Sequence, residues 1–189
     1  MILIDTGAWY ALTDPQERNH GHAVALYPRL TKGENGRMVT SDYILDETYT
    51  LIRMRLGIEP VKRLRDLLGQ SSSIQVVRVS DNEFERSVDL LLAHQDKRWS
   101  LTDCTSFVLM KDLEIRDAFT FDHNFSEAGI RVLPGSKDHL QLPGRKDHPP
   151  KPARCNSDRV RTTSQSALDR WAGAGAVTIA PHSTVQFGG

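Results

Sequence analysis

The chain has 189 residues, 39% of them hydrophobic, which suits one globular domain with a core of its own. No apolar run approaches the roughly 20 residues of a membrane-spanning helix. The N-terminus enters a strand without a basic or signal-like stretch, so we expect a cytoplasmic protein with no membrane partner. The formal net charge is +0, with 16 Lys and Arg against 20 Asp and Glu in residues 1–135. Net charge therefore does not by itself indicate nucleic-acid binding.

Short apolar segments recur along the first 135 residues and predict five strands buried on both faces. They are residues 2–4, 38–40, 74–79, 118–121 and 130–133. The two cysteines, Cys104 and Cys155, have neither the spacing of a zinc site nor that of a disulfide framework. The segments therefore have to be held together by an ordinary hydrophobic core.

Helical periodicity separates these segments. The expected helices begin at Ala8, at His20, after Ser41, at Glu59, after Ser80 and near Thr102, and a short one precedes the last strand. Pro28 is expected to kink the second helix or end it early. Ser80 and Glu83 have the spacing of a capping box, in which each side chain bonds the other residue's backbone.

Strands that alternate with helices predict a parallel sheet with helices on both faces, in one domain over residues 1–135. The ligand site of such a sheet lies outside the carboxyl ends of its strands, where the strand order reverses. Residues 136–189 are rich in Pro, Ser, Thr and Gly and have no apolar period, which predicts a disordered tail. Sequence from an altered or fused reading frame is the alternative origin of this tail.

Four acidic residues occupy positions that such a sheet would bring together. Asp5 ends the first strand, Glu47 lies within the third helix, Asp103 opens a later helix, and Asp122 follows the fourth strand. Each has an ordinary alternative: a turn at Asp5 or Asp122, a solvated helix surface at Glu47, and a favourable helix-dipole position at Asp103. Carboxylates in one crevice repel each other unless a divalent cation compensates them. One shared metal explains all four positions together.

A cation held by carboxylates suits phosphodiester hydrolysis, which needs an activated water and neutralised charge on the phosphate. We expect Mg²⁺ or Mn²⁺, with Asp5 and Asp103 as direct or near-direct ligands. Asp122 would bind a second ion or hold a metal-bound water, and Glu47 would orient or deprotonate the attacking water. Ser100 and Thr102 would support Asp103. The chain has no evident nucleophile–base pair, so we expect no covalent intermediate.

The motifs in order are Asp5-Thr6-Gly7-Ala8-Trp9, Glu47, Thr102-Asp103 and Phe121-Asp122-His123-Asn124-Phe125. Together they resemble the PIN-domain ribonucleases over about residues 1–134, and among these the VapC toxins of type II toxin–antitoxin systems. The resemblance implies a three-layer α/β/α sandwich with a five-stranded, mainly parallel sheet in the order 3-2-1-4-5. It also implies a metal-dependent endoribonuclease with an RNA substrate, an antitoxin partner and a homodimeric state.

Several further residues are candidates for substrate binding, each with a structural alternative such as a turn or a solvated helix face. They are Thr6, Arg53, Arg55, Lys62, Arg63, Arg65, His123 and Asn124. Trp9 could stack on a base, although packing is the better expectation. The alternative functions are an RNA-processing nuclease without a toxin role and a catalytically weak binding scaffold. A haloacid-dehalogenase-type phosphatase is disfavoured because Gly7 stands where that chemistry needs a second aspartate.

Overall fold

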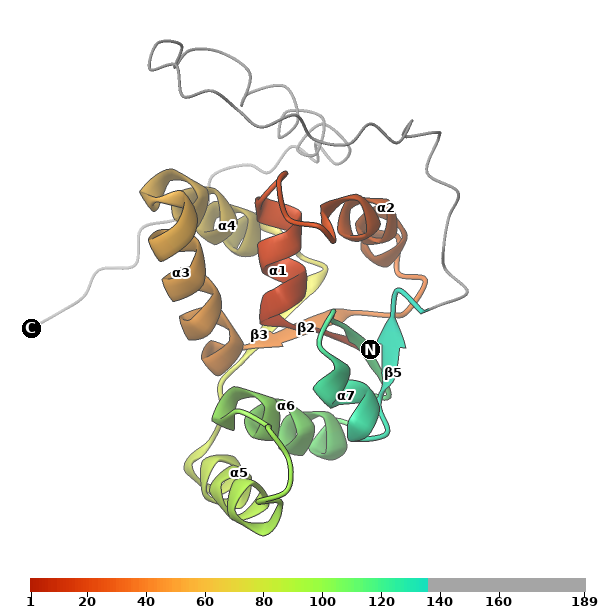
Figure 1. The fold of residues 1–189 in the computed structure, drawn as a ribbon. Helices are drawn as coiled ribbons and strands as arrows, with labels where there is room; N and C mark the ends of the chain where they lie inside the picture. The colour runs from red at the N-terminus through yellow and green to blue at the C-terminus, as the bar shows by residue number, and fades with distance from the viewer. Residues whose placement is uncertain (136–189) are drawn as a thin grey trace, which may run out of the picture. The chain divides into compact units, whose positions relative to one another are not determined.

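The computed structural model describes residues 1–135, and the predicted tail lies outside the described residues. Five strands form one sheet in the order β3-β2-β1-β4-β5, as Figure 1 shows. All four strand pairings are parallel, which confirms the expected topology. The strands are β1 (Ile2–Ile4), β2 (Met38–Ser41), β3 (Ile74–Val77), β4 (Asp117–Phe119) and β5 (Arg131–Leu133).

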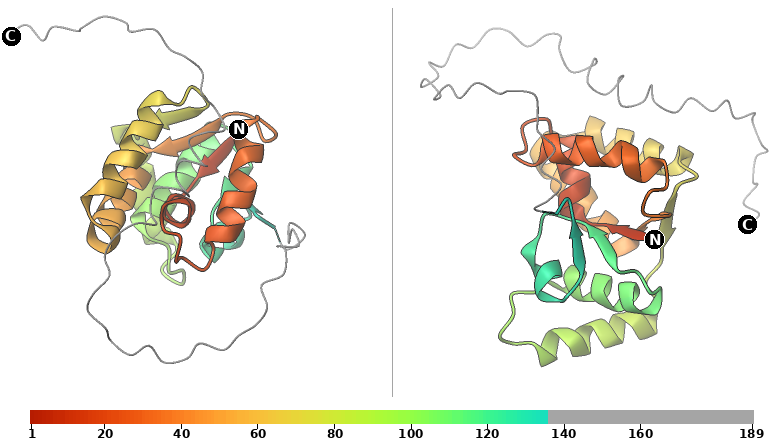
Figure 2. Two further views of the ribbon diagram at one scale, coloured as in Figure 1. Left: turned by 90° about the horizontal axis from the view of Figure 1, so that it is seen from above. Right: turned by 90° about the vertical axis from the view of Figure 1, so that its right-hand side faces the viewer.

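Seven helices within residues 1–135 cover both faces of the sheet. They are α1 (Thr6–Thr13), α2 (His20–Thr31), α3 (Asp42–Leu56), α4 (Ile58–Gln70), α5 (Asp81–Ala93), α6 (Leu101–Asp112) and α7 (His123–Glu127). Helices α1 to α4 lie on one side of the sheet and α5 and α6 on the other, as the views in Figures 1 and 2 agree. This is the predicted three-layer arrangement. Among residues 1–135, no helix has the length and apolarity needed to cross a membrane.

Burial is deepest in the central strands, as their uniformly apolar sequence predicts. Every residue of β1 and β2 is buried, and Leu3 pairs with Val39 on one side and Ala118 on the other. The edge strand β3 is half exposed and ends at Val77, two residues earlier than expected. Its outer edge has no neighbouring strand to hold Arg78 and Val79 in the ladder.

Two helix expectations can be compared with the structure. Helix α2 continues through the exposed Pro28 to Thr31, so Pro28 does not end it early. Helix α6 begins at Leu101 with Ser100 as its N-cap, next to Thr102, which confirms its expected start.

The core expectations for Trp9 and Cys104 are confirmed. Trp9 is 0% exposed, and its Nε1 donates a hydrogen bond to Thr40 Oγ1 at 3.3 Å. The indole therefore packs between α1 and β2 and is not available to stack on a base. Cys104 is a buried free thiol, and burial raises its pKa to about 11, so it is unreactive at neutral pH.

Candidate active site

The four carboxylates come from four separate elements at the carboxyl edge of the sheet. Asp5 directly follows β1 at the N-cap position of α1, where its side chain makes no capping bond, and Asp122 follows β4 and caps α7. Because β1 and β4 are paired neighbours, their ends lie side by side. Glu47 lies in the second turn of α3, and Asp103 is in the first turn of α6. The first turns of α1, α3 and α6 approach one another at this edge in Figure 1.

Thr120 joins the carboxylate of Asp5 to the backbone of Asp122. Its hydroxyl donates to Asp5 Oδ2 at 2.7 Å and accepts from the Asp122 backbone N–H at 3.0 Å. The N–H can only donate, so the direction of the hydroxyl proton toward Asp5 is fixed. Thr120 is fully buried and was not anticipated from the sequence. Its one signal is a hydroxyl within the apolar segment Phe119-Thr120-Phe121, at a strand end.

Asn124 joins Asp103 to Asp122. Its Nδ2 donates to Asp103 Oδ2 at 3.0 Å and to Asp122 Oδ2 at 3.4 Å. Asp103 Oδ2 also accepts from the Ser100 backbone N–H at 2.8 Å, in a capping box whose other half is the Ser100 side chain. The helix-cap interpretation of Asp103 and its place in the acidic site are therefore both supported by its contacts.

Thr6 connects Glu47 to this group. The Thr6 hydroxyl donates to Glu47 Oε2 at 2.9 Å, and the adjacent Asp5 is bonded to Thr120. Glu47 is exposed, whereas Asp5 and Asp103 are 6% and 8% exposed. A chain of hydrogen bonds and adjacent residues thus links all four predicted carboxylates, with Glu47 at the solvent side.

The acidic group lacks a basic counterion. Within residues 1–135, no Lys or Arg nitrogen lies within 4 Å of any of the four carboxylates. The exposed imidazole of His123 is 3.4 Å from Asp122 and is charged only when protonated. The pKa of Asp5 is raised to about 6, mainly by burial and in smaller part by the charges of Asp103 and Glu47, against the lowering effect of the hydrogen bonds from Thr120 and the Thr6 backbone. Among the described residues, the negative charge of the site therefore has no Lys or Arg partner.

Asp117 shows the opposite electrostatic arrangement at the opposite edge of the sheet. It is also a buried aspartate, but the guanidinium of Arg131 pairs with both its oxygens, and Asn35 donates to it at 3.3 Å. The Arg131 bonds hold the pKa of Asp117 below its ordinary value. Within residues 1–135, a guanidinium therefore pairs with Asp117, whereas no Lys or Arg pairs with Asp5, Glu47, Asp103 or Asp122.

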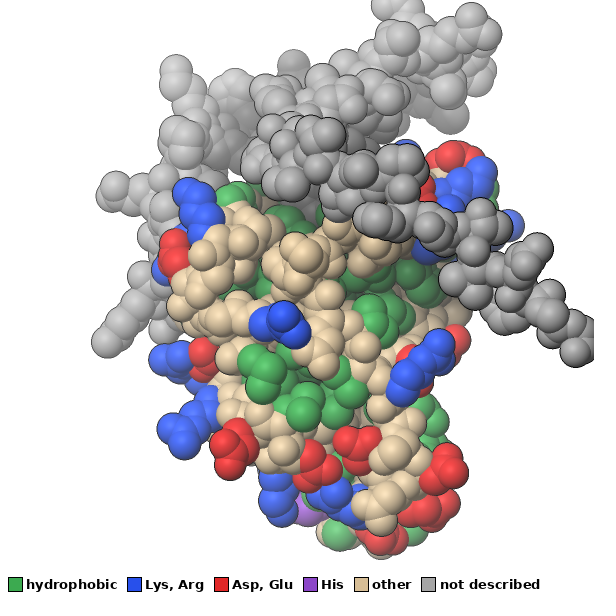
Figure 3. All heavy atoms as spheres, turned by 180° about the vertical axis from the view of Figure 1, so that it is seen from behind, with side chains coloured by type: hydrophobic (Ala, Val, Ile, Leu, Met, Phe, Trp, Pro, Cys, Tyr) green, Lys and Arg blue, Asp and Glu red, His purple; other side chains and the backbone are tan. Residues whose placement is uncertain are grey.

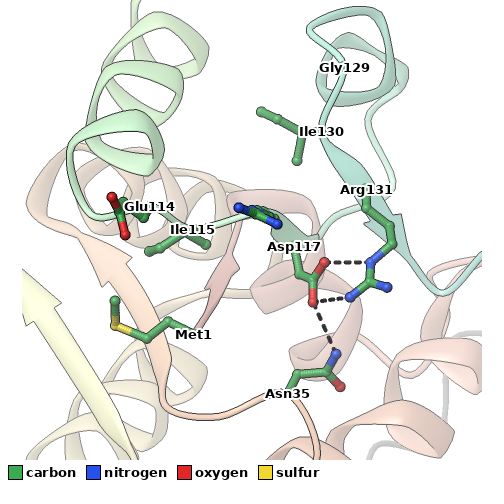
Figure 4. Close-up of a pocket in the computed structure, with 9 residues that line it drawn as sticks. Met1, Asn35, Glu114, Ile115, Asp117, Gly129, Ile130 and Arg131 are labelled. Carbon is green, nitrogen blue, oxygen red and sulfur yellow. Dashed lines mark hydrogen bonds and ion pairs between the residues drawn. The ribbon is translucent and has the colours of Figure 1, made fainter.

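A hollow lies at the Asp117 edge of the sheet, away from the acidic group. It encloses about 680 Å³ and is open to solvent, with Met1, Asp117 and Arg131 in its lining (Figure 4). We place the functional site at the carboxylates because the charge of Asp117 is already matched. An ion site that acts on an extended polymer also needs no deep cavity.

The acidic group supplies hard oxygen ligands of the kind that Mg²⁺ and Mn²⁺ accept. With the side chains as they stand in residues 1–135, no three Asp, Glu, His or Cys groups are close enough to hold one ion. Neutral donors hold the carboxylates instead, through bonds to Thr6, Thr120 and Asn124. The donor chemistry fits a cation, and the side chains would have to rotate to close a ligand shell.

The predicted substrate contacts fall into two groups. Thr6 and Asn124 are buried and bond the carboxylates, so they belong to the acidic group. The basic residues all lie on the exposed surface of α3 and α4, where Lys62 pairs with Glu59 and Arg65 with Asp66. Arg53, Arg55 and Arg63 form no ion pair within residues 1–135, and none of the five basic residues bonds the acidic group.

Charge is mixed on the face turned away from the view of Figure 1. Figure 3 shows Lys and Arg side chains standing singly there among Asp, Glu and hydrophobic side chains. Where residues 1–135 are visible on that face, positive and negative side chains are intermixed.

A parallel α/β sheet with uncompensated carboxylates at its carboxyl edge defines a class of candidate metal-assisted hydrolases. The PIN domain profile matches residues 2–130, and the chain belongs to the PIN-domain family. The resemblance drawn from the four motifs is thereby confirmed.

Within this family the chain is similar to VapC ribonucleases. It is 32% identical over 135 residues to the 23S rRNA-specific endonuclease VapC20 of Mycobacterium tuberculosis, covering 71% of this chain and 99% of that protein. It is 26% identical to a VapC ribonuclease of Archaeoglobus fulgidus, covering 66% of this chain and 78% of that protein.

Solved structures agree with the sequence comparisons. The crystal structure of M. tuberculosis VapC20, described as a sarcin–ricin loop cleaving toxin, matches with a TM-score of 0.63 and 29% identity. The match covers 69% of this chain and 96% of that one. FitAcB from Neisseria gonorrhoeae matches with a TM-score of 0.51 and 18% identity over 70% of this chain and 96% of that one, which concerns the fold alone.

Proposed function

We propose that this chain is a metal-dependent endoribonuclease that hydrolyses RNA phosphodiester bonds. The observation that carries the proposal is the linked set of four carboxylates without a basic counterion, at the edge where α/β sheets bind ligands. The same sheet neutralises its other buried aspartate, Asp117, with Arg131. A site left anionic in such a protein is suited to an external cation.

Asp5, Asp103 and Asp122 would hold Mg²⁺ or Mn²⁺, which when bound lowers the pKa of water and neutralises charge on the phosphate. Glu47 is exposed and fixed by Thr6, so it can orient an incoming water and accept its proton. Thr120 and Asn124 keep the buried carboxylates in place through neutral donors. Because these donors carry no charge, they do not compete with a cation for the site.

We expect Asp103→Ala to lower RNA cleavage by about 100-fold or more, in line with losses on removing groups that support a metal. The Ala variant should gain no thermal stability from Mn²⁺, whereas the wild type should gain several degrees at saturating ion. Asp117→Asn is the matched control, because it removes a buried carboxylate from the other edge and should leave the Mn²⁺ response intact. Unchanged cleavage by purified Asp103→Ala protein would reject the assignment.

The similarity to VapC20 supports a role as the toxin of a toxin–antitoxin pair, acting in the cytoplasm. The antitoxin would be a small protein from a neighbouring reading frame, and we propose a homodimer as the toxin's own state. Induction of the chain should arrest growth, and co-expression of the neighbouring frame should relieve the arrest. Growth arrest by an Asp5→Ala variant of equal abundance would contradict a nuclease toxin.

Structured ribosomal RNA is the first substrate to test, because VapC20 is named for cleaving 23S rRNA. New RNA ends in cells that express the wild type, compared with Asp5→Ala, would identify the cut site. New ends found only in transfer or messenger RNA would support the proposed nuclease activity but show that ribosomal RNA is not its substrate. Ends in precursor RNAs without growth arrest would favour an RNA-processing nuclease, and no new ends with no Mn²⁺ response would favour a binding scaffold.

A further inference from the structure

We infer that Asn124 is a positioning residue that holds Asp103 and Asp122 ready for a cation, and that it does not bind substrate. The inference deepens the proposed function and rests on it. It replaces the expectation from the sequence that Asn124 contacts RNA.

The hydrogen bonds that Asn124 donates with its side chain and its backbone N–H both go to the acidic group. Its side-chain Nδ2 donates to Asp103 Oδ2 at 3.0 Å and Asp122 Oδ2 at 3.4 Å. Its backbone N–H donates to Asp122 Oδ1 at 2.9 Å. Asn124 therefore contacts one oxygen of Asp103 and both oxygens of Asp122.

Burial separates Asn124 from its neighbour in sequence. Asn124 is 7% exposed, whereas the side chain of His123 is 78% exposed. RNA bases and phosphates can reach His123 at this turn, but the amide of Asn124 is covered. The amide orientation is also determined, because reversal would place Oδ1 against two carboxylates.

Asparagine suits this position because its amide donates two hydrogen bonds without carrying charge. A Lys or Arg here would neutralise the carboxylates and compete with the cation. An Asp would add a further negative charge and remove both donors. Only a neutral donor keeps Asp103 and Asp122 close together while leaving their charge for an ion.

Two variants and one control test the inference through Mn²⁺ binding, measured by electron paramagnetic resonance of free Mn²⁺ and by thermal unfolding. Asn124→Ala should weaken Mn²⁺ binding by about 10- to 100-fold, as loss of a group that orients ligands does. Asn124→Asp removes both amide donors, so it should also weaken Mn²⁺ binding, and its added negative charge should lower the unfolding midpoint in EDTA. The matched control is Asn35→Ala, which removes an equivalent amide–aspartate bond at the far edge and should leave Mn²⁺ binding unchanged.

Cleavage kinetics separate positioning from substrate binding. For Asn124→Ala we expect the cleavage rate to recover when Mn²⁺ is raised in proportion to its weaker binding, with an RNA KM like that of the wild type. If Asn124→Ala raised the KM for RNA and bound Mn²⁺ like the wild type, the inference would be overturned, although the proposed metal-dependent activity would stand. If the wild type itself binds no Mn²⁺, the proposed function fails as well. If Asn124→Ala does not fold, wild-type Mn²⁺ binding by the isosteric Asn124→Asp would overturn the inference by itself.

Discussion

At the scale of single residues, two buried aspartates of one sheet have opposite environments. Burial raises the pKa of Asp5 from 3.8 to about 6, and neutral donors offset this only in part. Arg131 lowers the pKa of Asp117. The difference identifies which edge of the sheet needs a cation from outside, and it makes the pH dependence of stability measurable at each edge.

In EDTA, we expect Asp5 to destabilise the folded chain as pH rises from about 4 to 6. The unfolded state loses this proton near 3.8 and the folded state near 6, so the folded state binds more protons between these values. The free energy of unfolding should fall by about 3 kcal/mol over this window. Urea unfolding of wild type and Asp5→Asn at several pH values would measure it, and the variant should be the more stable at pH 7.

Asp117 supplies a control of opposite sign. Its lowered pKa stabilises the folded chain above the ordinary aspartate value, and this stability is lost as pH falls through the lowered pKa. Asp117→Asn should therefore have a lower free energy of unfolding than the wild type at neutral pH, and this difference should disappear in acid. The free energy of unfolding of each variant should differ from that of the wild type by an amount that changes with pH. A difference that stayed constant with pH would contradict the environment assigned to that aspartate.

At the scale of elements, two helices begin with the same motif for different purposes. Ser80 and Glu83 form a capping box at α5, and Ser100 and Asp103 form one at α6. Glu83 is half-buried and bonds only the cap, whereas Asp103 is buried and also accepts from Asn124. Helix capping at α6 therefore fixes the position of a site carboxylate.

We expect Ser80→Ala and Ser100→Ala each to lower the free energy of unfolding by about 1 kcal/mol, the usual cost of a lost N-cap. Only Ser100→Ala should also weaken Mn²⁺ binding and cleavage, because it frees the turn that carries Asp103. Denaturant unfolding and Mn²⁺ titration of both variants would test this. Equal effects of the two variants on Mn²⁺ binding would show that the α6 cap has no particular link to the site.

At the scale of the whole molecule, the five-stranded sheet and the helices that cover it are built from residues 1–135. The central strands are fully buried, β5 ends at Leu133, and the PIN match ends at residue 130. The division into a domain over residues 1–135 and a tail over residues 136–189 stays a prediction.

A chain that ends at residue 135 should fold in one cooperative transition. We expect its free energy of unfolding to lie within about 0.5 kcal/mol of the full chain, the range of changes away from a core. Its RNA cleavage should match that of the full chain. Urea unfolding of the two chains is the measurement, and a loss of several kcal/mol would show that the folded unit extends beyond residue 135.

The sequence by itself determined the elements and the four acidic positions. Apolar runs and helical periods are local properties, so they predicted the strands and most helix starts, including the Ser80–Glu83 cap. The positions of Asp5, Glu47, Asp103 and Asp122 followed from strand ends and helix turns. The strand order came from the resemblance, since local patterns do not specify which strands pair.

Only the tertiary structure decided how the carboxylates are held. The bonds of Thr120 to Asp5 and of Asn124 to Asp103 join residues 115 and 21 positions apart. No local pattern specifies such pairs, because they depend on which strand ends and helix starts pack together. For the same reason the sequence could not reveal that Asp117 has Arg131 beside it, while no Lys or Arg of residues 1–135 pairs with the four site carboxylates.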